Sequence, residues 1–260
     1  MTGIDFAIFL ALKEASSGEA TQMLEVCAKS LHRSDPDATV FLLTDEATLP
    51  VLPAVPMTPI VMSQRVNVDE ILLERTRAYR AFLDLAAFRR DTIFLDHDMV
   101  ANRSLATTFE GRFDLAATFR TWTQKYPING GFIAVRHASS PVVRRFYDRV
   151  LSIYEDMSAA KDRLWDGEQA SLKAALSPLP DPLTAGVYTT MHGESVALFD
   201  TSRINYSIWD GYPPHALPDT MTEEMFADMA RRDLVHFKGK RKSYMAGYWA
   251  SLTRATRPMA

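Results

Sequence analysis

Two aspartates follow a short apolar run near the middle of the 260-residue chain, within the sequence DTIFLDHDMV. The run Thr92–Leu95 is rich in β-favouring residues and predicts a buried strand. Asp96 and Asp98 come directly after it, so both carboxylates can approach one hard cation, which in turn can bridge the two phosphates of a nucleotide. The alternative is that the two aspartates open a solvated turn, and this stretch does not decide between the two interpretations.

A basic helix is expected immediately before this strand. Apolar residues recur at helical spacing between Asp69 and Phe88, and the helix carries Arg75, Arg77 and Arg80. Arg77 and Arg80 are three positions apart and therefore neighbours on the helix surface. Two guanidiniums beside a carboxylate-bound metal suit the forked oxygens of a diphosphate, whereas the alternative is a solvated basic face.

Two later segments offer groups that could line a reaction site. Asn129-Gly130-Gly131 heads a predicted strand, where paired glycines allow backbone to approach a ligand or simply form a turn. Glu168 and Gln169 stand at the start of a predicted helix. Their side chains either contact a substrate or cap the helix, and the sequence leaves both interpretations open.

A histidine at the end of a late apolar strand precedes a cluster of positive charge. His236 follows Leu234-Val235, and four cations lie within Lys238–Lys242 around Gly239. Repulsion between these cations predicts a mobile loop that becomes ordered over a bound diphosphate, with His236 meeting a metal ion as neutral imidazole. The alternatives are a structural histidine and an ordinary basic surface loop.

The elements that must position these residues alternate in type along the first part of the chain. Strand Ile4–Leu12, helix Ala20–Leu31 and strand Thr39–Thr44 form a βαβ unit, which makes the strands parallel and the crossover right-handed. Prolines at three-residue spacing form a stiff connection to strand Ile60–Met62.

The second part of the chain continues the α/β pattern. Further elements are expected at Phe113–Phe119, Ile128–Val135, Pro141–Tyr154, Trp165–Leu176, Val187–Phe199 and Leu234–Phe237. We therefore predict a single α/β domain over residues 1–260, with a mainly parallel central sheet flanked by helices. We expect residues 1–100 to form a Rossmann-like half that binds a nucleotide diphosphate, called here the donor half. Residues 101–260 are then expected to form a second half, called here the acceptor half.

Composition excludes several classes of protein. The formal net charge of -3 argues against a dedicated nucleic-acid binder. A single cysteine, Cys27, excludes a disulfide framework and a cysteine-built zinc site, and it fits a reducing compartment. The first apolar run has the features of a strand rather than a signal peptide, and no stretch reaches the ~18–20 apolar residues of a membrane span. We therefore expect a cytoplasmic protein.

FLDHD after a basic helix, then NGGF, DGEQ and HFKGKRK together resemble the GT-A-fold glycosyltransferases, closest in pattern to family-8-like galactosyl- and glucosyltransferases. The resemblance spans nearly the whole chain. It implies a GT-A nucleotide-diphospho-sugar transferase (a hexosyltransferase, EC 2.4.-) that moves a hexose from a nucleotide diphosphate sugar to a hydroxyl of a glycan or lipid-linked glycan. A UDP-sugar is the first candidate donor. Retention at the anomeric carbon is implied by the resemblance alone.

The resemblance also implies roles for individual residues. Asp96, Asp98 and His236 correspond to ligands of Mn²⁺, for which Mg²⁺ is the alternative. Lys242, with Gly239 before it, corresponds to a lysine on the donor diphosphate, and Arg80 to a basic residue that contacts the donor.

The reacting sugar is lined in that family at the positions of Asn129, Glu168 and Gln169. The sequence departs from the family pattern at Gly130, at Glu168, where an aspartate is usual, and at Ser243-Tyr244, which replace a proline and a tryptophan. The subfamily is therefore left open. Sugar transfer from a nucleotide diphosphate is also consistent with these residues on physical grounds. A cation and fixed positive groups stabilise the charge that develops on the departing diphosphate.

Three other functions remain to be weighed. Asp96, Asp98 and Val100 also match the nucleophile pattern of haloacid-dehalogenase-like phosphatases, although such an aspartate is expected near the start of the fold and a second acidic pair is missing. A nucleotidyltransferase would need a glycine-rich loop after the first strand, and the sequence has none there. The non-enzymatic alternative is an inactive transferase-like protein that binds carbohydrate.

The end of the chain is basic. From Arg231 onward eight basic residues stand against one acid, Asp233, and aromatic residues lie between them. Such a tail can make peripheral contact with an anionic membrane, where each cation contributes roughly 1 kcal/mol. The alternative is that some of these cations bind the donor and the others are solvated.

Overall fold

The computed structural model describes residues 3–13, 17–63, 65–121, 123, 125–159, 167–209 and 214–255. The main elements are β1 (Asp5–Phe9), α1 (Ser17–Ser34), β2 (Val40–Asp45), β3 (Thr58–Ser63), α2 (Ile71–Phe82), β4 (Thr92–Leu95), β5 (Met99–Ala101), β6 (Leu115–Phe119), β7 (Ile128–Val135), α3 (Ser140–Ala159), α4 (Gly167–Ala175), β8 (Gly186–Thr189), β9 (Ser195–Asp200), α5 (Glu223–Ala230), β10 (Leu234–His236) and α6 (Met245–Ala255). Short 3₁₀ segments join some of them, including η6 (Gly239–Tyr244).

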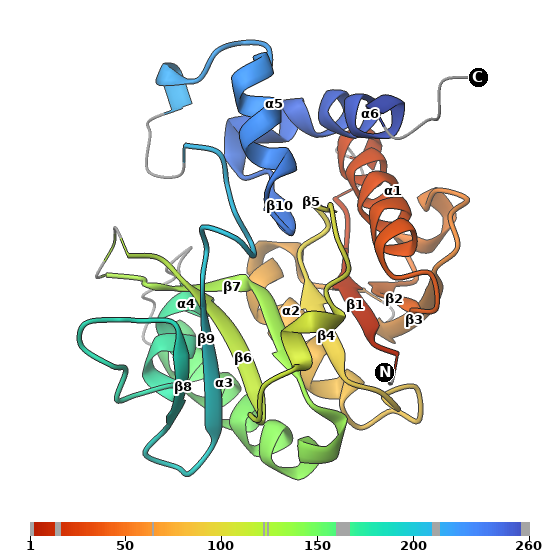
Figure 1. The fold of residues 1–260 in the computed structure, drawn as a ribbon. Helices are drawn as coiled ribbons and strands as arrows, with labels where there is room; N and C mark the ends of the chain where they lie inside the picture. Colours follow the sequence, from red (N-terminus) through yellow and green to blue (C-terminus); the bar gives the residue numbers. More distant parts are fainter. Residues whose placement is uncertain are drawn as a thin grey trace.

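A central sheet runs through the molecule in the order β3-β2-β1-β4-β7-β6-β9-β8 (Figure 1). The strands β3, β2, β1 and β4 are mutually parallel, as the predicted βαβ unit requires. β7 is antiparallel to both of its neighbours, whereas β9 is parallel to β6 and β8 closes the sheet antiparallel. The predicted α/β class with flanking helices is confirmed.

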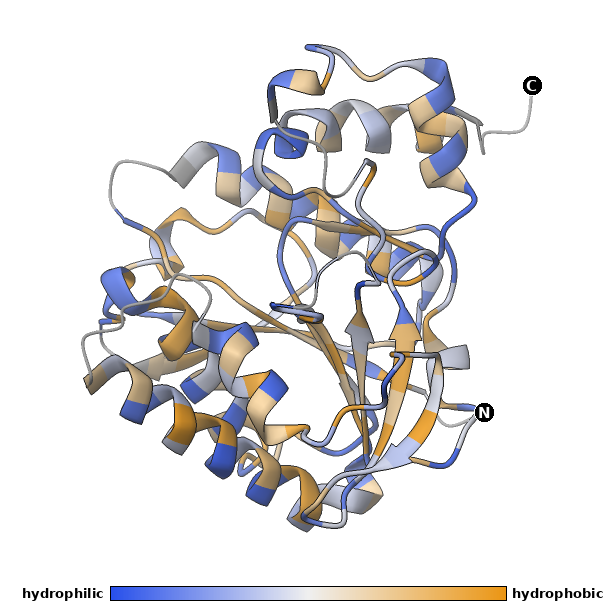
Figure 2. Cartoon of the chain, turned by 90° about the vertical axis from the view of Figure 1, so that its left-hand side faces the viewer, coloured by the Kyte–Doolittle hydropathy of each residue, from blue (hydrophilic) through white to orange (hydrophobic). Residues whose placement is uncertain are grey.

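Helices cover both faces of this sheet, and each face has its own hydrophobic core. In β1, Phe6 and Ile8 belong to the core that includes residues of α1, α5 and α6, whereas Ala7 and Phe9 belong to the core that includes residues of α2, α3 and α4. This alternation follows from the two-residue period of side chains along a strand. Because both faces of the sheet are buried, the strands appear in the sequence as continuous apolar runs. Figure 2 shows the central strands largely in hydrophobic colours, whereas the helices carry both hydrophilic and hydrophobic stretches.

The direction of β7 decides which segments meet at one edge of the sheet. Because β7 runs opposite to β4 and β6, its first residues lie beside the last residues of those two strands. Asp96 donates its backbone N–H to the carbonyl oxygen of Gly131 at 3.2 Å. The aspartate motif and the Asn129-Gly130-Gly131 motif, separated in sequence, are therefore adjacent in space.

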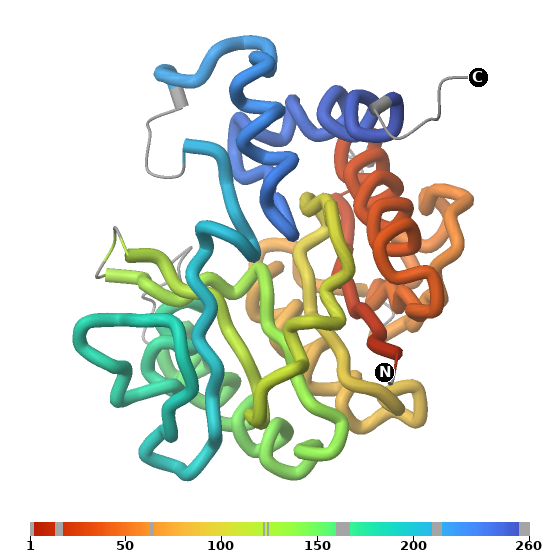
Figure 3. The backbone as a smooth tube through the Cα atoms, in the orientation of Figure 1, coloured from red at the N-terminus to blue at the C-terminus, as the bar shows by residue number. Residues whose placement is uncertain are grey.

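A second, two-stranded sheet lies above this edge. β5 begins immediately after the aspartates and pairs antiparallel with β10, with His236 opposite Met99. The segment after β9 leaves the main sheet and runs toward β10 (Figure 3), where Tyr206 forms a bridge to Val235. The late strand that carries His236 is thus held directly over the aspartates.

Most predicted elements are present, with three omissions and one overlong helix. The sequence analysis did not predict β5, α5 or α6. A strand of three residues such as β5 is too short to show a periodicity. The helix expected from Asp69 to Phe88 is α2, which is shorter at both ends. Trp165 and Asp166 of the predicted fourth helix lie outside the described residues, and α4 is described from Gly167.

None of the helices in the described part of the chain has both the length and the apolar character needed to cross a bilayer.

Tyr248 gives a test of how the second sheet is held. Its side chain is fully buried against Phe226 and Phe237, and its hydroxyl donates to Asn102 Oδ1 at 2.8 Å. We expect Tyr248→Ala to lower the free energy of unfolding by about 3–5 kcal/mol through the cavity it leaves. Tyr248→Phe, the matched control, should cost about 1 kcal/mol through the lost hydrogen bond. Urea denaturation measures both, and equal losses would contradict this account.

Candidate functional site

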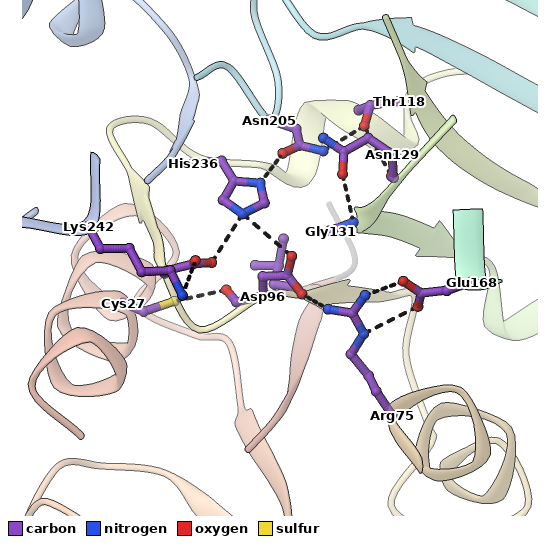
Figure 4. A network of polar contacts seen from close by, with 12 residues as sticks. Cys27, Arg75, Asp96, Thr118, Asn129, Gly131, Glu168, Asn205, His236 and Lys242 are labelled. Carbon is purple, nitrogen blue, oxygen red and sulfur yellow. Dashed lines mark hydrogen bonds and ion pairs between the residues drawn. The ribbon is translucent and has the colours of Figure 1, made fainter. Parts of the chain in front are cut away.

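Three side chains form a compact cluster at the edge where β4, β7 and β10 meet. Ligand atoms of Asp96, Asp98 and His236 all lie within 4.8 Å of one another (Figure 4). His236 Nε2 is 3.1 Å from Asp98 Oδ1 and 3.5 Å from Asp96 Oδ2. Adjacent ligands on an octahedral ion with bonds of roughly 2.1 Å are about 3.0 Å apart. Two carboxylates and one imidazole at this spacing suit Mn²⁺ or Mg²⁺ better than a soft metal.

The electrostatics of the cluster favour a cation. Asp98 is only 6% exposed, and within the described residues its Oδ1 makes no hydrogen bond of acceptable geometry, although His236 lies close by. Burial alone would raise the pKa of Asp98, but His236 and Lys242 beside it lower that pKa well below its ordinary value. The carboxylate is therefore held charged in a place where positive charge must balance it.

Lys242 adds a fixed cation to the cluster. Its Nζ lies 3.2 Å from Asp98 Oδ2. The chain reaches this position through a turn at Gly239, whose φ of 55° is in the left-handed region that glycine adopts without strain. Gly239 thus turns the chain so that Lys242 lies beside Asp98, and contact of Lys242 with a donor diphosphate stays a prediction.

The other cations of this segment have separate partners. Lys240 pairs with Asp219 at 3.1 Å, and the buried Arg241 donates to the backbone carbonyls of Ile208 and Trp209. The expectation that crowded cations repel one another and keep the segment mobile does not hold for these side chains, because each is directed to its own acceptor. Closure over a donor stays a prediction.

A buried arginine links the cluster to α4. The guanidinium of Arg75 forms ion pairs with Asp96 and with Glu168, and its Nε also lies 3.2 Å from Glu168 Oε1 (Figure 4). Burial opposes its charge, but the two acids raise the pKa of Arg75 well above its ordinary value. Burial raises the pKa of Glu168, and Arg75 opposes that change. Arg75 therefore couples Asp96 to the predicted sugar side of the site.

The predicted donor role of Arg77 and Arg80 needs correction. Arg77 pairs with Glu155 at 2.9 Å and Arg80 with Asp148 at 2.5 Å, and both acids belong to α3. The structure therefore brings neither arginine to the aspartate cluster. The guanidinium that reaches Asp96 belongs to Arg75.

The sequence contains a signal that distinguishes these arginines. Arg75 lies three positions after Leu72, four after Ile71 and four before Tyr79, on the apolar face that packs against the sheet. An arginine on a buried helix face requires an acidic partner. Arg77 and Arg80 lie on the opposite side of α2, where they form ion pairs with α3, so this side is a contact between helices rather than the solvated face given as the alternative.

The paired glycines make room for carboxylates. Neither Gly130 nor Gly131 has a φ in the left-handed region. A Cβ on Gly130 would lie 2.6 Å from Glu168 Oε2, and a Cβ on Gly131 would lie 2.6 Å from Asp96 Oδ2 and 2.8 Å from His236 Cε1. The glycines are thus explained by the side chains packed against β7, the two acids foremost, and not by a turn.

The remaining predicted site residues lie close to this network. Asn129 on β7 is 3% exposed and accepts a hydrogen bond from the backbone of Gly131 at 3.1 Å, while its Nδ2 has no partner among the described residues. Gln169 follows Glu168 on α4 and is half-buried. Asn205 and Thr118, which sequence reasoning did not single out, also join the network, and no local sequence signal identifies them.

Comparison with known proteins gives a consistent picture of the fold. No family model matches the chain, and no curated protein matches it. Among solved structures, the galactosyltransferase LgtC in complex with donor and acceptor sugar analogues is 15% identical, with a TM-score of 0.58 over 98% of this chain and 97% of that one.

Two further glycosyltransferases are similar at 12% identity and a TM-score of 0.55. GlyE of Streptococcus pneumoniae TIGR4 matches over 98% of this chain and 63% of its own, and a glycosyltransferase involved in glycosylation of the major capsid of PBCV-1 matches over 97% and 99%. The chain therefore has the fold of GT-A-type glycosyltransferases, as the sequence resemblance predicts.

Gly131 provides a direct test of the cluster. Gly131→Ala should push Asp96 and His236 apart and weaken Mn²⁺ binding by roughly 10- to 100-fold, as measured by isothermal titration calorimetry. The control is Gly247→Ala on the exposed side of α6, where a Cβ would meet nothing within 4 Å. That change should leave binding unaltered and stabilise the helix by up to about 1 kcal/mol. Unchanged affinity in Gly131→Ala would argue against a metal site here.

The ionisation of Asp98 should also make the free energy of unfolding depend on pH. Because its pKa is lower in the folded protein than the ~3.9 of an unfolded aspartate, it stabilises the fold above that pH. This contribution is lost as the pH falls toward the lower, folded value. The difference in free energy of unfolding between wild type and Asp98→Asn, measured in urea with EDTA, should therefore shrink between about pH 5 and pH 2. A constant difference would contradict the assigned pKa shift.

Proposed function

We propose that this protein is a metal-dependent glycosyltransferase that moves a hexose from a nucleotide diphosphate sugar to a hydroxyl of a glycan or lipid-linked glycan. UDP-sugars are the first candidate donors. The observation that carries the proposal is the convergence of Asp96, Asp98, His236 and Lys242 at one edge of a GT-A-type sheet. Retention at the anomeric carbon is part of the proposal and is supported only by the likeness to family-8-like enzymes.

In this proposal Asp96, Asp98 and His236 hold Mn²⁺ or Mg²⁺, which supplies positive charge to the departing diphosphate. Lys242, already beside Asp98, adds a second fixed cation at the same place. The bond between the anomeric carbon and the phosphate oxygen breaks and leaves its electron pair on that oxygen. The acceptor oxygen bonds to the anomeric carbon, and the proton of the acceptor hydroxyl passes to the departing diphosphate. Arg75 keeps Asp96 oriented while this charge develops.

Of the three residues predicted near the reacting sugar, Gln169 and Asn129 are proposed to face it, whereas Glu168 acts through Arg75. The carboxylate of Glu168 is occupied by Arg75 and is buried, so its role is to hold Arg75 in place. Gln169 is less buried and is the better group to contact the sugar near its anomeric carbon. The unpartnered Nδ2 of Asn129 needs an acceptor, and a sugar hydroxyl is a suitable one.

The rival functions have less support. A phosphatase of the haloacid-dehalogenase type would carry its nucleophile near the start of the fold, whereas Asp96 follows the fourth strand and one oxygen of its carboxylate pairs with Arg75. An inactive carbohydrate-binding protein would share the fold and the cluster but lack turnover. Catalytic measurement separates these cases.

The proposed location is the cytoplasm. Contact of the basic tail with anionic membranes stays a prediction. The described cations Arg231, Arg232 and Lys240 have acidic partners, and Lys242 belongs to the proposed donor site, which favours the alternative that these charges serve structure and donor binding. Arg257 lies outside the described residues.

A donor screen tests the proposal. Hydrolysis of nucleotide sugars with Mn²⁺ should release the nucleoside diphosphate and free sugar, and EDTA should abolish it. Asp98→Asn should reduce turnover by about 100-fold or more, because several kcal/mol of charge stabilisation are lost. Asp37→Asn, an exposed aspartate outside the proposed site, is the matched control and should remain active.

The outcomes separate the three functions. A phosphatase would release inorganic phosphate from simple phosphate esters and ignore the sugar, and a binding protein would bind a nucleotide sugar in calorimetry without consuming it. Turnover that survives EDTA would refute metal dependence.

A further inference from the structure

A buried asparagine faces the second nitrogen of His236. Asn205 is fully buried, and its Oδ1 lies 2.7 Å from His236 Nδ1 (Figure 4). We propose that Asn205 is a positioning residue of the metal site: it accepts the Nδ1 proton of His236 and so presents the Nε2 lone pair to the cation. This inference rests on the proposed metal-dependent function and assigns a role to a residue outside the ligand set.

The neighbours of Asn205 determine which way its amide faces. Asn205 Nδ2 donates to Thr118 Oγ1 at 2.7 Å, and the Thr118 hydroxyl is directed to the carbonyl oxygen of Asn129 at 3.5 Å. Because that hydroxyl donates to a carbonyl, its lone pair is available to the amide N–H of Asn205. The amide oxygen must then point to His236, and an oxygen can only accept. The hydrogen bond therefore requires a proton on Nδ1.

The opposite nitrogen faces the aspartates. His236 Nε2 lies 3.1 Å from Asp98 Oδ1 and 3.5 Å from Asp96 Oδ2. In the Nδ1-protonated neutral tautomer, Nε2 carries a lone pair, so three electron-rich atoms converge on one point. Metal-binding histidines commonly donate their other N–H to an oxygen that fixes the ring and its tautomer. Asn205 supplies that oxygen.

The backbone at Asn205 supports a role for its side chain. Its φ of 67° lies in the left-handed region, where glycine is the least strained residue and asparagine is among the better tolerated others. The next residue, Tyr206, exchanges hydrogen bonds with β10, donating to Leu234 and accepting from His236 at 2.7 Å. The amide is thus anchored to the strand that carries the histidine.

The same contacts extend back to the aspartates. Asn129 accepts from the backbone of Gly131 at 3.1 Å, and the Gly131 carbonyl accepts from the backbone of Asp96 at 3.2 Å. A series of hydrogen bonds therefore leads from His236 through Asn205, Thr118 and β7 to Asp96. Replacement of Asn205 should therefore change the tautomer of the His236 ring without removing any of the proposed metal ligands.

The tautomer can be measured without turnover or metal. Long-range ¹H–¹⁵N spectra of metal-free, histidine-labelled protein at pH 9, with His236 assigned from its absence in His236→Gln, report which nitrogen carries the proton. We expect Nδ1 to carry it in the wild type and in Asn205→Asp, which retains an acceptor oxygen. Asn205→Gly, which suits the backbone but has no acceptor, should shift the population toward protonated Nε2.

Two further variants control the measurement. Thr118→Val keeps the side-chain shape but removes the acceptor of Asn205 Nδ2, so it should shift the tautomer in the same direction even if Asn205→Gly folds poorly. Asn67→Gly changes an exposed asparagine on a surface turn and should have no effect. A wild-type His236 protonated on Nε2, or an unchanged tautomer in both Asn205→Gly and Thr118→Val, would overturn the proposal.

Metal affinity gives the second readout. Titration with Mn²⁺ should show a loss of about 10- to 100-fold in Asn205→Gly, with Asn205→Asp within a few-fold of wild type. Equal affinity in wild type and Asn205→Gly would refute the positioning role. Failure of the wild type to bind Mn²⁺ would refute the proposed function and the metal part of this inference, while the tautomer measurement would still decide whether Asn205 fixes His236.

Discussion

Three carboxylates are packed together in the interior of this protein, and their mutual repulsion is the constraint on which the site depends. Asp98 and Glu168 are buried, and Asp96 lies between them. Removing a carboxylate from water costs several kcal/mol unless positive charge and hydrogen bonds compensate. Arg75 compensates Asp96 and Glu168, whereas Asp98 faces His236 and Lys242. The divalent cation that we propose at the aspartates would complete this balance of charge.

The topology of the sheet explains why these charges meet. Parallel strands alone would bring together only their carboxyl ends, and the antiparallel β7 adds its amino end to the same edge. Gly130 and Gly131 then leave the volume that Glu168 and Asp96 fill. The small β5–β10 sheet adds the histidine from above. Irregular and short elements, which contribute little to the core, therefore carry much of the chemistry.

The similarity to solved glycosyltransferases rests on the path of the chain and not on shared sequence. At 12–15% identity the structures agree over nearly the whole of this chain. A fold of this kind accommodates different donors and acceptors through a few side chains at the sheet edge. The groups that would select the sugar are thus to be sought around Gln169 and Asn129, and the groups that would bind the diphosphate around Lys242.

From the amino-acid sequence we predicted the α/β class, most of the elements and a candidate site made of Asp96, Asp98, His236 and Lys242. Hydrophobic periodicity and the order of short motifs are local properties that can be read along the chain. The choice of Arg75 over Arg77 and Arg80 was within reach of the sequence, because helical spacing places Arg75 on the apolar face. The roles of Asn205 and Thr118 were decided only by the tertiary structure. Asn205 lies 31 residues before His236 and 87 after Thr118, and no local pattern specifies contacts over such separations. The tertiary structure likewise showed that the paired glycines accommodate carboxylates. The atoms that a Cβ would meet belong to α4, β5, β10 and the aspartate that follows β4, and these approach β7 only once the sheet has formed.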